Sequence, residues 1–179
     1  MRSWSDFANL QDKLIRTNCI PDGSKIYWDL RPHHAYPTLE FRFMDVCTRV
    51  EEAVCFAAIL QALILKLWRL RHDNMTFRVY PADLVEENKW RAVRYGLEGS
   101  LIDFGKEKEV PARELIEEMI DWFLADVLDE LGTKDCVQYA KRILDEGASA
   151  DRQLKAFAQS GDLKTVVDHL VAETAEGVR

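Results

Sequence analysis

The sequence predicts an α+β protein in which a few antiparallel strands are packed by a long buried helix and followed by an all-helical tail. Runs of alternating apolar and polar residues, which are typical of strands, occur only before residue 111. One long run, from Thr48 to about Arg71, is apolar nearly all round. We therefore expect a single region with a sheet-containing part over 1–110 and a helical tail over 111–179.

Composition is that of a globular protein and argues against an extended nucleic-acid surface. Hydrophobic residues make up 47% and charged residues 31% of the 179 residues. The net charge is −7, so we expect no nucleic-acid partner. The first residues lack the apolar segment of a signal peptide. The four cysteines form no CxxC pair, which indicates a reducing, cytoplasmic setting, and the adjacent pair His33 and His34 lacks the HExxH spacing of a zinc site.

Two strands are predicted within the first 45 residues. Ser3 is placed to cap a first helix, and Pro21–Gly23 is a turn. Lys25–Leu30 then predicts a strand with Arg31 at its end, because Pro32 blocks its continuation. We expect this strand to be the sheet neighbour of the next one along the chain.

That next strand, residues 36–45, is the centre of the predicted fold. Read with period two, Leu39, Phe41 and Phe43 share an apolar face that can be buried against helices. Glu40 and Arg42 fall on the opposite face, about 6–7 Å apart along the strand. A guanidinium fork binds phosphoryl or carboxylate oxygens, and a carboxylate is a hard ligand for Mg²⁺. The alternative is an ordinary Glu/Arg pair on the wet face of a sheet.

A capping box, Thr48–Glu51, opens the long apolar helix. We expect this helix to lie across the apolar face of the sheet and to be covered on more than one side. Its most apolar run, Ala53–Leu67, is shorter than the ~20 residues that span a bilayer, so we expect no membrane partner.

Pro81 starts a further helix that ends near Gly96, and Leu101–Val110 predicts a hairpin turning near Gly105. Five residues share one face of the helix at helical spacing: Glu87, Asn88, Arg91, Arg94 and Tyr95. Each also has an ordinary interpretation. Asn88 can be a surface amide, Arg91 and Arg94 can pair with Glu87 and Glu98, and Tyr95 can belong to the core.

From Pro111 the chain is predicted to be helical, with breaks at Gly132 and Gly147 and a last helix capped by Asp162. Two strands and one hairpin are too few for an independent sheet. The sequence therefore looks like the later part of a larger sheet protein.

Several groups of residues form a pattern when they are taken in order. They are Asp29–Pro32, Pro37–Arg42 with Asp45, and Glu87–Leu97, followed by Ile143–Gly147, Asp151–Gln153 and Gly161–Leu163. This pattern resembles the C-terminal half of the carboxylate–amine ligase family, the type-2 glutamate–cysteine ligases, and covers essentially the whole chain. Family members are about twice as long, and their first half carries a Glu-x-Glu strand that has no counterpart here.

The resemblance implies a glutamine-synthetase-like catalytic fold and a reaction that uses ATP and Mg²⁺. A substrate carboxylate would be phosphorylated by ATP, and an amine would then displace phosphate to form an amide. The resemblance also implies roles for residues. Glu40 would be a Mg²⁺ ligand, and Arg42 and Arg31 would be catalytic groups: Arg42 would hold the acyl phosphate or the substrate carboxylate, and Arg31 would reach phosphate oxygens. Four residues would bind substrate: Asn88, Arg91, Arg94 and Tyr95.

Two further expectations follow from the unfinished sheet. The chain is expected to form a homo-oligomer or to associate with the missing N-terminal half. The second hypothesis for function is accordingly a non-catalytic or split-enzyme module, which docks on a partner that supplies the missing strands.

Overall fold

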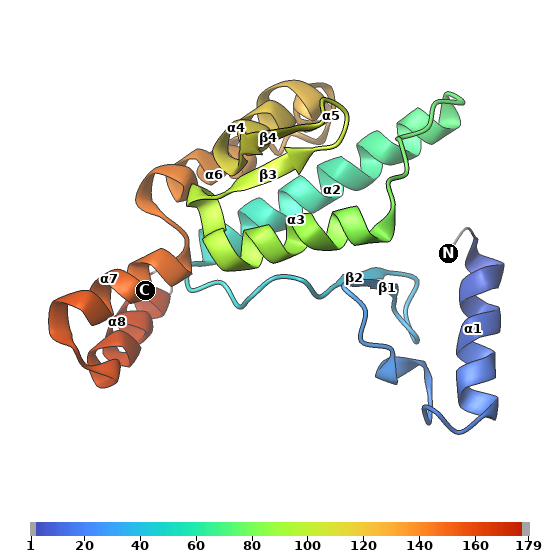
Figure 1. Ribbon diagram of the computed structural model, residues 1–179, viewed down its shortest axis with the longest axis horizontal. Coiled ribbons are helices and arrows are strands. Elements are labelled where there is room, and N and C mark those ends of the chain that lie inside the picture. Colours follow the sequence, from blue (N-terminus) through green and yellow to red (C-terminus); the bar gives the residue numbers. More distant parts are fainter. Residues whose placement is uncertain (1–2, 177–179) are drawn as a thin grey trace. The chain divides into compact units, whose positions relative to one another are not determined.

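The computed structural model describes residues 3–176 and divides the chain into two compact units, Met1–Val46 and Cys47–Arg179. Figure 1 labels their helices and strands. The units are called here the first and the second unit, and each is described by itself. Helices and short antiparallel strands are both present, which confirms the α+β class.

The first unit contains one helix and one pair of strands. Its elements are α1 (Trp4–Arg16), the 3₁₀ turn η1 (Gly23–Lys25), β1 (Leu30–Pro32) and β2 (Leu39–Phe41). Ser3 caps α1 as predicted, because its hydroxyl accepts a hydrogen bond from the backbone N–H of Asp6 at 3.1 Å. Phe7 of α1 is buried, and its ring meets that of Trp28 edge-on with centroids 6.0 Å apart.

Strands β1 and β2 are antiparallel neighbours, as the sequence predicts, but each is only three residues long. Most of the predicted strand Lys25–Leu30 lies outside β1: Lys25 belongs to the η1 turn and Leu30 is the first residue of β1, which includes Arg31 and Pro32 instead of stopping before the proline. The first unit by itself leaves the apolar face of β2 open, since Leu39 and Phe43 are 47% and 52% exposed, and the burial of this face against helices stays a prediction.

The second unit is mostly helical. It contains α2 (Val50–His72), α3 (Ala82–Tyr95), η2 (Gly96–Glu98), β3 (Ser100–Asp103), β4 (Lys108–Pro111), α4 (Ala112–Glu118), the π-helical turn η3 (Met119–Phe123), α5 (Ala125–Leu131), α6 (Lys134–Glu146), α7 (Ser149–Ser160) and α8 (Leu163–Glu176). The predicted hairpin is confirmed, with Leu101 opposite Val110 in the antiparallel pair β3–β4.

Several helices in this unit begin and end at the capping residues predicted from the sequence. Gly96 and Gly132 end α3 and α5 at positive φ, where a residue without Cβ is favoured. Asp162 caps α8 by accepting hydrogen bonds from the backbone N–H groups of Lys164 and Thr165 at 3.1 and 3.3 Å. The predicted helix over 111–131 is interrupted by η3, so its two ends form α4 and α5.

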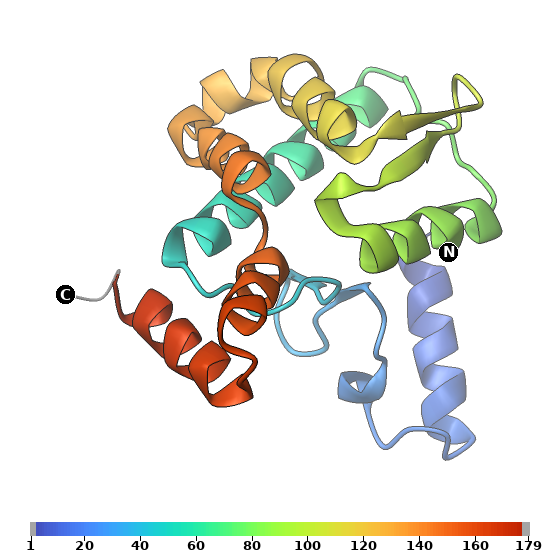
Figure 2. The same cartoon turned by 60° about the vertical axis from the view of Figure 1, so that its left-hand side comes forward.

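The core of the second unit lies between α2 and the helices η3, α5 and α6, which cross above it in Figures 1 and 2. One face of α2 supplies Cys55, Ala58 and Ala62 to this core. Small residues on that face let the helices approach closely and pack without voids. Facing residues come from the later helices: Ile120, Leu124, Val127, Leu128, Val137 and Ala140.

Within the second unit by itself, α2 is covered on one side, and the prediction that it is covered on more than one side stays a prediction. Its face away from the core leaves Val54 47%, Ile64 43% and Trp68 59% exposed. By length and composition alone α2 could cross a membrane, a test that the core helices of soluble proteins also pass.

The predicted capping box at the start of α2 does not form. The N-cap residue is Arg49, without a side-chain capping bond, and Thr48 is used elsewhere. The Thr48 hydroxyl accepts a hydrogen bond from Arg152 of α7 at 3.0 Å. A tertiary partner far along the chain has therefore taken the group that local sequence assigned to the cap.

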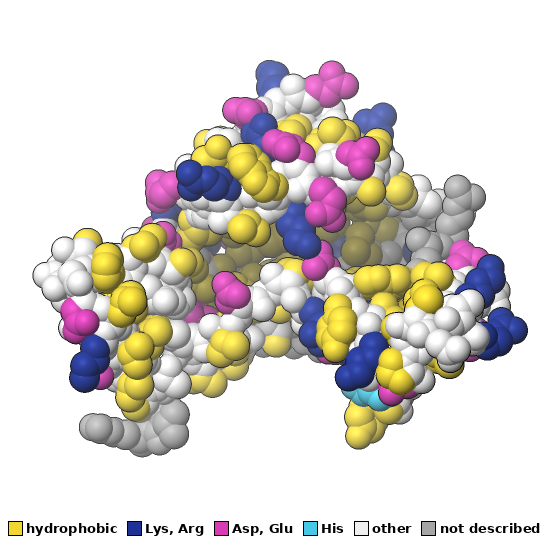
Figure 3. Space-filling view, turned by 60° about the horizontal axis from the view of Figure 1, so that its bottom comes forward, with side chains coloured by type: hydrophobic (Ala, Val, Ile, Leu, Met, Phe, Trp, Pro, Cys, Tyr) yellow, Lys and Arg dark blue, Asp and Glu magenta, His cyan; other side chains and the backbone are white. Residues whose placement is uncertain are grey.

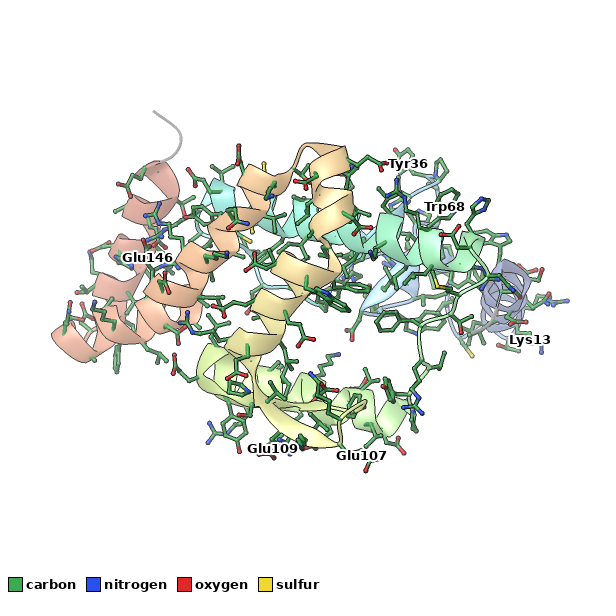
Figure 4. All side chains as sticks on the ribbon, turned by 90° about the horizontal axis from the view of Figure 1, so that it is seen from above. Lys13, Tyr36, Trp68, Glu107, Glu109 and Glu146 are labelled. Carbon is green, nitrogen blue, oxygen red and sulfur yellow. The ribbon has the colours of Figure 1, made fainter. Side chains whose placement is uncertain are left out.

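A buried ion-pair network joins α2 to the last two helices. Arg152 lies 2.6 Å from Glu52 of α2 and 2.7 Å from Glu173 of α8, and the three side chains are at most 9% exposed. Arg49 extends the network to Glu173 and to Glu146, at 2.9 and 2.7 Å. Glu146 is labelled at the end of α6 in Figure 4. Ion pairs, in addition to packing, therefore connect α7 and α8 to the rest of the unit.

Candidate functional site: an arginine–glutamate cluster and the polar face of α3

The three residues predicted for phosphate and metal chemistry come together in the first unit. Arg31 and Glu40 are direct partners across the β1–β2 pair. The Arg31 Nε donates to Glu40 Oε2 at 2.8 Å, and the Arg42 Nη1 donates to Glu40 Oε1 at 2.6 Å. We call these three residues the arginine–glutamate cluster.

Arg31 is the buried member of the cluster, with 7% of its side chain exposed. Its Nη1 donates to the backbone carbonyls of Ser24 and Ile26 at 2.7 and 2.5 Å. One carbonyl oxygen of the η1 turn and one from the residue that follows it therefore fix the guanidinium in one orientation. Arg31 is a structural anchor of the first unit, not a loose charge at the end of a strand.

Arg42 is the accessible member, with 37% of its side chain exposed. Its backbone N–H donates to the carbonyl of Asp29 at 2.7 Å, which continues the strand ladder. Its guanidinium carbon lies 5.4 Å from the centroid of the Tyr27 ring. The ring and Glu40 hold the guanidinium from two sides, so Arg42 is oriented and can still reach a ligand.

The electrostatics of the cluster favour an anion. The hydrogen bonds from Arg31 and Arg42 lower the pKa of Glu40 from 4.5 to about 2. Glu40 is therefore ionised at neutral pH, and two arginines against one carboxylate leave a net charge of about +1. A phosphoryl or carboxylate group that meets Arg42 would find a preorganised positive partner.

A magnesium ion fits this cluster only in part. Glu40 offers hard oxygen atoms, but each is already in an ion pair with an arginine. Among residues 3–176, no three His, Cys, Asp or Glu side chains gather in a way that could hold a metal ion. Further ligands would have to come from phosphate oxygens, from water or from residues outside this part of the chain.

The predicted substrate-binding residues lie on α3 in the second unit, beside the β3–β4 hairpin. Asn88 makes two hydrogen bonds to Ile102 of β3: its Nδ2 donates to the carbonyl at 2.9 Å, and its Oδ1 accepts from the N–H at 2.7 Å. The amide thus acts as an extra rung on the edge of β3 and joins the helix to the hairpin.

Arg91 lies one turn further along α3 and holds the other strand. Its Nε donates to Glu87 at 2.9 Å and its Nη1 to Glu109 of β4 at 2.7 Å. These hydrogen bonds, with Glu109 the stronger cause, raise the pKa of Arg91. Figure 4 labels Glu109 on the hairpin.

A hollow of about 460 Å³ opens between the end of α3 and the hairpin. Trp90 and Tyr95 line it with their rings edge to face at 5.6 Å, and the guanidinium carbon of Arg94 lies 5.6 Å from the Tyr95 centroid. Tyr95 is 52% exposed, so it is not a core residue. The remaining lining residues are Arg91, Glu98, Gly99, Ser100 and Glu109.

Comparison with known proteins identifies the family to which the chain belongs. Residues 1–169 match the family described as Glutamate-cysteine ligase family 2 (GCS2). The chain is 52% identical over 177 residues to a protein of Solibacter usitatus named "Putative glutamate--cysteine ligase 2", a match that covers 99% of this chain and 46% of that protein. The chain belongs to glutamate–cysteine ligase family 2.

Other proteins with the same printed name give the same result. One from Chloroflexus aggregans is 53% identical over 176 residues, covering 98% of this chain and 45% of that protein. One from Sorangium cellulosum is 43% identical over 176 residues, covering 98% of this chain and 47% of that protein. The chain therefore spans just under half the length of the family 2 relatives it matches.

In this family 2 chain the predicted site residues form two groups. Glu40, Arg42 and Arg31 make one group in the first unit, and Asn88, Arg91, Arg94 and Tyr95 make the other in the second unit. Their roles in substrate, phosphate or metal binding stay predictions.

Three contributors were missed by the sequence analysis. The backbone carbonyls of Ser24 and Ile26 orient Arg31, and no sequence pattern marks a carbonyl for that task. Glu109 could have been found. It pairs with Ile102 across the hairpin, and Asn88 and Arg91 are three residues apart on one helix face, so each can reach one partner of that pair.

Proposed function

We propose that the chain is the C-terminal half of an ATP-dependent carboxylate–amine ligase that resembles glutamate–cysteine ligase. Family membership supports the reaction class, and the chain's coverage of just under half of each relative supports its being one half. The catalytic sheet would be glutamine-synthetase-like, with β1 and β2 as two of its strands. Glutamate and cysteine are the substrates that the relatives' names indicate.

The arginine–glutamate cluster is the observation that carries the proposal. Phosphoryl transfer collects negative charge on the transferring oxygens, and preorganised guanidinium groups stabilise that charge. Arg42 is held by Glu40 and Tyr27 yet remains 37% exposed. Arg31 is locked by two backbone carbonyls and maintains the position of Glu40.

The proposed chemistry has two steps. An oxygen of the substrate carboxylate attacks the γ-phosphorus of ATP, the bond to the β-phosphate oxygen breaks, and an acyl phosphate and ADP form. The amine then attacks the acyl carbon, inorganic phosphate leaves, and the amine gives up a proton. In both steps Arg42 would bind the oxygens of the phosphoryl group and keep them oriented for displacement.

Bound Mg²⁺ would neutralise charge on the nucleotide phosphates, and Glu40 would be one of its ligands in this chain. In the second unit, Arg91 and Tyr95 line the hollow beside the hairpin and would contact substrate there, and Arg94, beside the Tyr95 ring, would contact it next to the hollow. Asn88 would act there by fixing α3 against β3. The proposal also includes a cytoplasmic setting and association with the N-terminal half or with further copies.

The test uses a joined protein, in which this chain replaces the 177 matched residues of the Solibacter usitatus relative. ADP release is measured with a panel of carboxylates and amines, and the intact relative serves as the control. We expect release that requires one carboxylate and one amine together. Release with no amine-dependent product, or none at all where the intact relative is active, contradicts the proposal.

A second candidate function is a non-catalytic or split-enzyme module that docks on a partner. The free edges of the short β1–β2 pair favour it, because an unpaired strand edge can accept a further strand. Binding of Mg·ATP by this chain alone tests the two candidates together. Weak binding fits either a half-enzyme or a module, whereas tight binding would show that the nucleotide site needs no missing strands and would contradict both.

A further inference from the structure

The second unit carries an apolar surface that its own core does not use. Beside the face of α2 that carries Cys55, Ala58 and Ala62, exposed residues recur every three or four positions. They are Val50, Val54, Ala57, Gln61, Ile64 and Trp68, and are called here the α2 stripe. Figure 4 labels Trp68 toward the C-terminal end of the helix.

The stripe is unlike the wet face of an ordinary amphipathic helix. No charged residue occurs from Ala53 to Leu65, and Gln61 is the one polar residue of the stripe itself. A helix that is apolar on both faces is normally covered on both. Exposed hydrophobic side chains also line α7 and α8, the lobe at the left of Figure 3, but charged residues such as Lys155 and Asp168 alternate with them.

We propose that the α2 stripe is the docking surface for the part of the family 2 chain that lies outside the matched residues. More than half of each relative lies outside the match, so a large polypeptide segment accompanies this helix in those proteins. An apolar stripe five turns long that the second unit leaves uncovered needs an extended apolar partner, and the comparisons record a long segment of that kind of protein beyond the matched residues.

A lipid bilayer is the less suitable occupant. The opposite face of α2 carries Lys66, which pairs with Asp126 at 2.8 Å, and the buried Glu52, which pairs with Arg152 at 2.6 Å. Insertion would take these charges and the helices that hold them into the hydrocarbon region. Docking against another protein surface leaves both pairs in place.

The proposal predicts that the same substitution changes Tm little in this chain alone and lowers it in the joined protein. In this chain alone, Ile64→Glu and Trp68→Glu change exposed positions, so the melting temperature Tm should move by less than about 2 °C. In the joined protein the same changes would bury a charge at an apolar contact. We expect Tm to fall there by at least about 5 °C.

A matched control is available in the same unit. Trp122 is 74% exposed, compared with 59% for Trp68, and lies outside α2. Trp122→Glu should leave Tm nearly unchanged in both contexts. If the joined protein is insoluble, the two parts are produced together as separate polypeptides, and Trp68→Glu should reduce their co-purification at least about tenfold.

Three results would overturn the proposal. The first is that the stripe variants are neutral in the joined protein, or that the separate parts do not co-purify. The second is an equal loss from Trp122→Glu. The third is another occupant: a dimer of the joined protein that Trp68→Glu dissociates, or flotation of the joined protein with phosphatidylcholine vesicles that Ile64→Glu abolishes.

Discussion

Arg31 and Glu40 face each other across two antiparallel strands, with Nε and Oε2 2.8 Å apart, and Arg31 is 7% exposed whereas Glu40 is 27% exposed. The buried guanidinium therefore fixes the accessible carboxylate. Glu40 in turn pairs with Arg42 at 2.6 Å. The buried Arg31 therefore positions, through Glu40, the arginine that is accessible to a ligand. An active site requires this kind of support beneath its contacting groups.

The titration of Glu40 tests this chain of contacts. Its pKa in the folded protein is lowered to about 2 from the ordinary 4.5. A lowered pKa stabilises the fold above the ordinary value, and this contribution is lost as the pH falls from about 4.5 to about 2. NMR of the side-chain carboxyl carbon should show a midpoint near 2.

The variant Arg42→Ala should raise that midpoint toward 4.5, because one of the two hydrogen bonds that lower the pKa is removed. Arg113→Ala, which removes the ion pair with Asp145 in the second unit, is the control and should leave the midpoint unchanged. A Glu40 midpoint that does not respond to Arg42→Ala would contradict the described pairing.

The buried network at Arg152 is expected to dominate the stability of the helical tail. Arg152→Ala leaves Glu52 and Glu173 as neighbouring buried carboxylates without their shared partner. We expect the free energy of unfolding, measured in urea, to fall by about 3–5 kcal/mol. Lys164→Ala removes an exposed pair with Asp168 and should cost less than about 1 kcal/mol. An equal decrease in the free energy of unfolding for the two variants would show that the buried network stabilises the protein no more than an exposed ion pair does.

Asn88 should matter for folding whatever its role toward substrate. Asn88→Ala leaves the N–H and C=O of Ile102 without their side-chain partner, so the free energy of unfolding should fall by about 1–3 kcal/mol. Glu86→Ala, at an exposed position of the same helix, should change it by less than about 0.5 kcal/mol. Unchanged stability of Asn88→Ala would argue that the amide is free to serve a ligand.

Elements with strong local signals could be predicted from the sequence. The cap at Ser3, the hairpin of β3 and β4, the glycine stops at Gly96 and Gly132, and the Asp162 cap all depend on residues a few positions apart. The pairing of Glu40 and Arg42 on one strand face was found by period two for the same reason.

Elements decided by distant partners could not be predicted. Thr48 satisfied every local requirement of a capping box, but Arg152, more than a hundred residues away, uses its hydroxyl. The helix α2 has the composition of a helix buried all round, and only its contacts show that the second unit by itself covers one face of it. Periodicity gives the faces of an element and does not identify what covers them.

The activity of the joined protein after substitution in the arginine–glutamate cluster tests the central claim most directly. We expect Arg42→Ala and Glu40→Ala each to reduce substrate-dependent ADP release at least about 100-fold, with far-UV circular dichroism unchanged. The control Arg142→Ala removes an exposed ion pair with Glu146 and should keep release within about twofold. Release that survives both cluster substitutions would contradict the account.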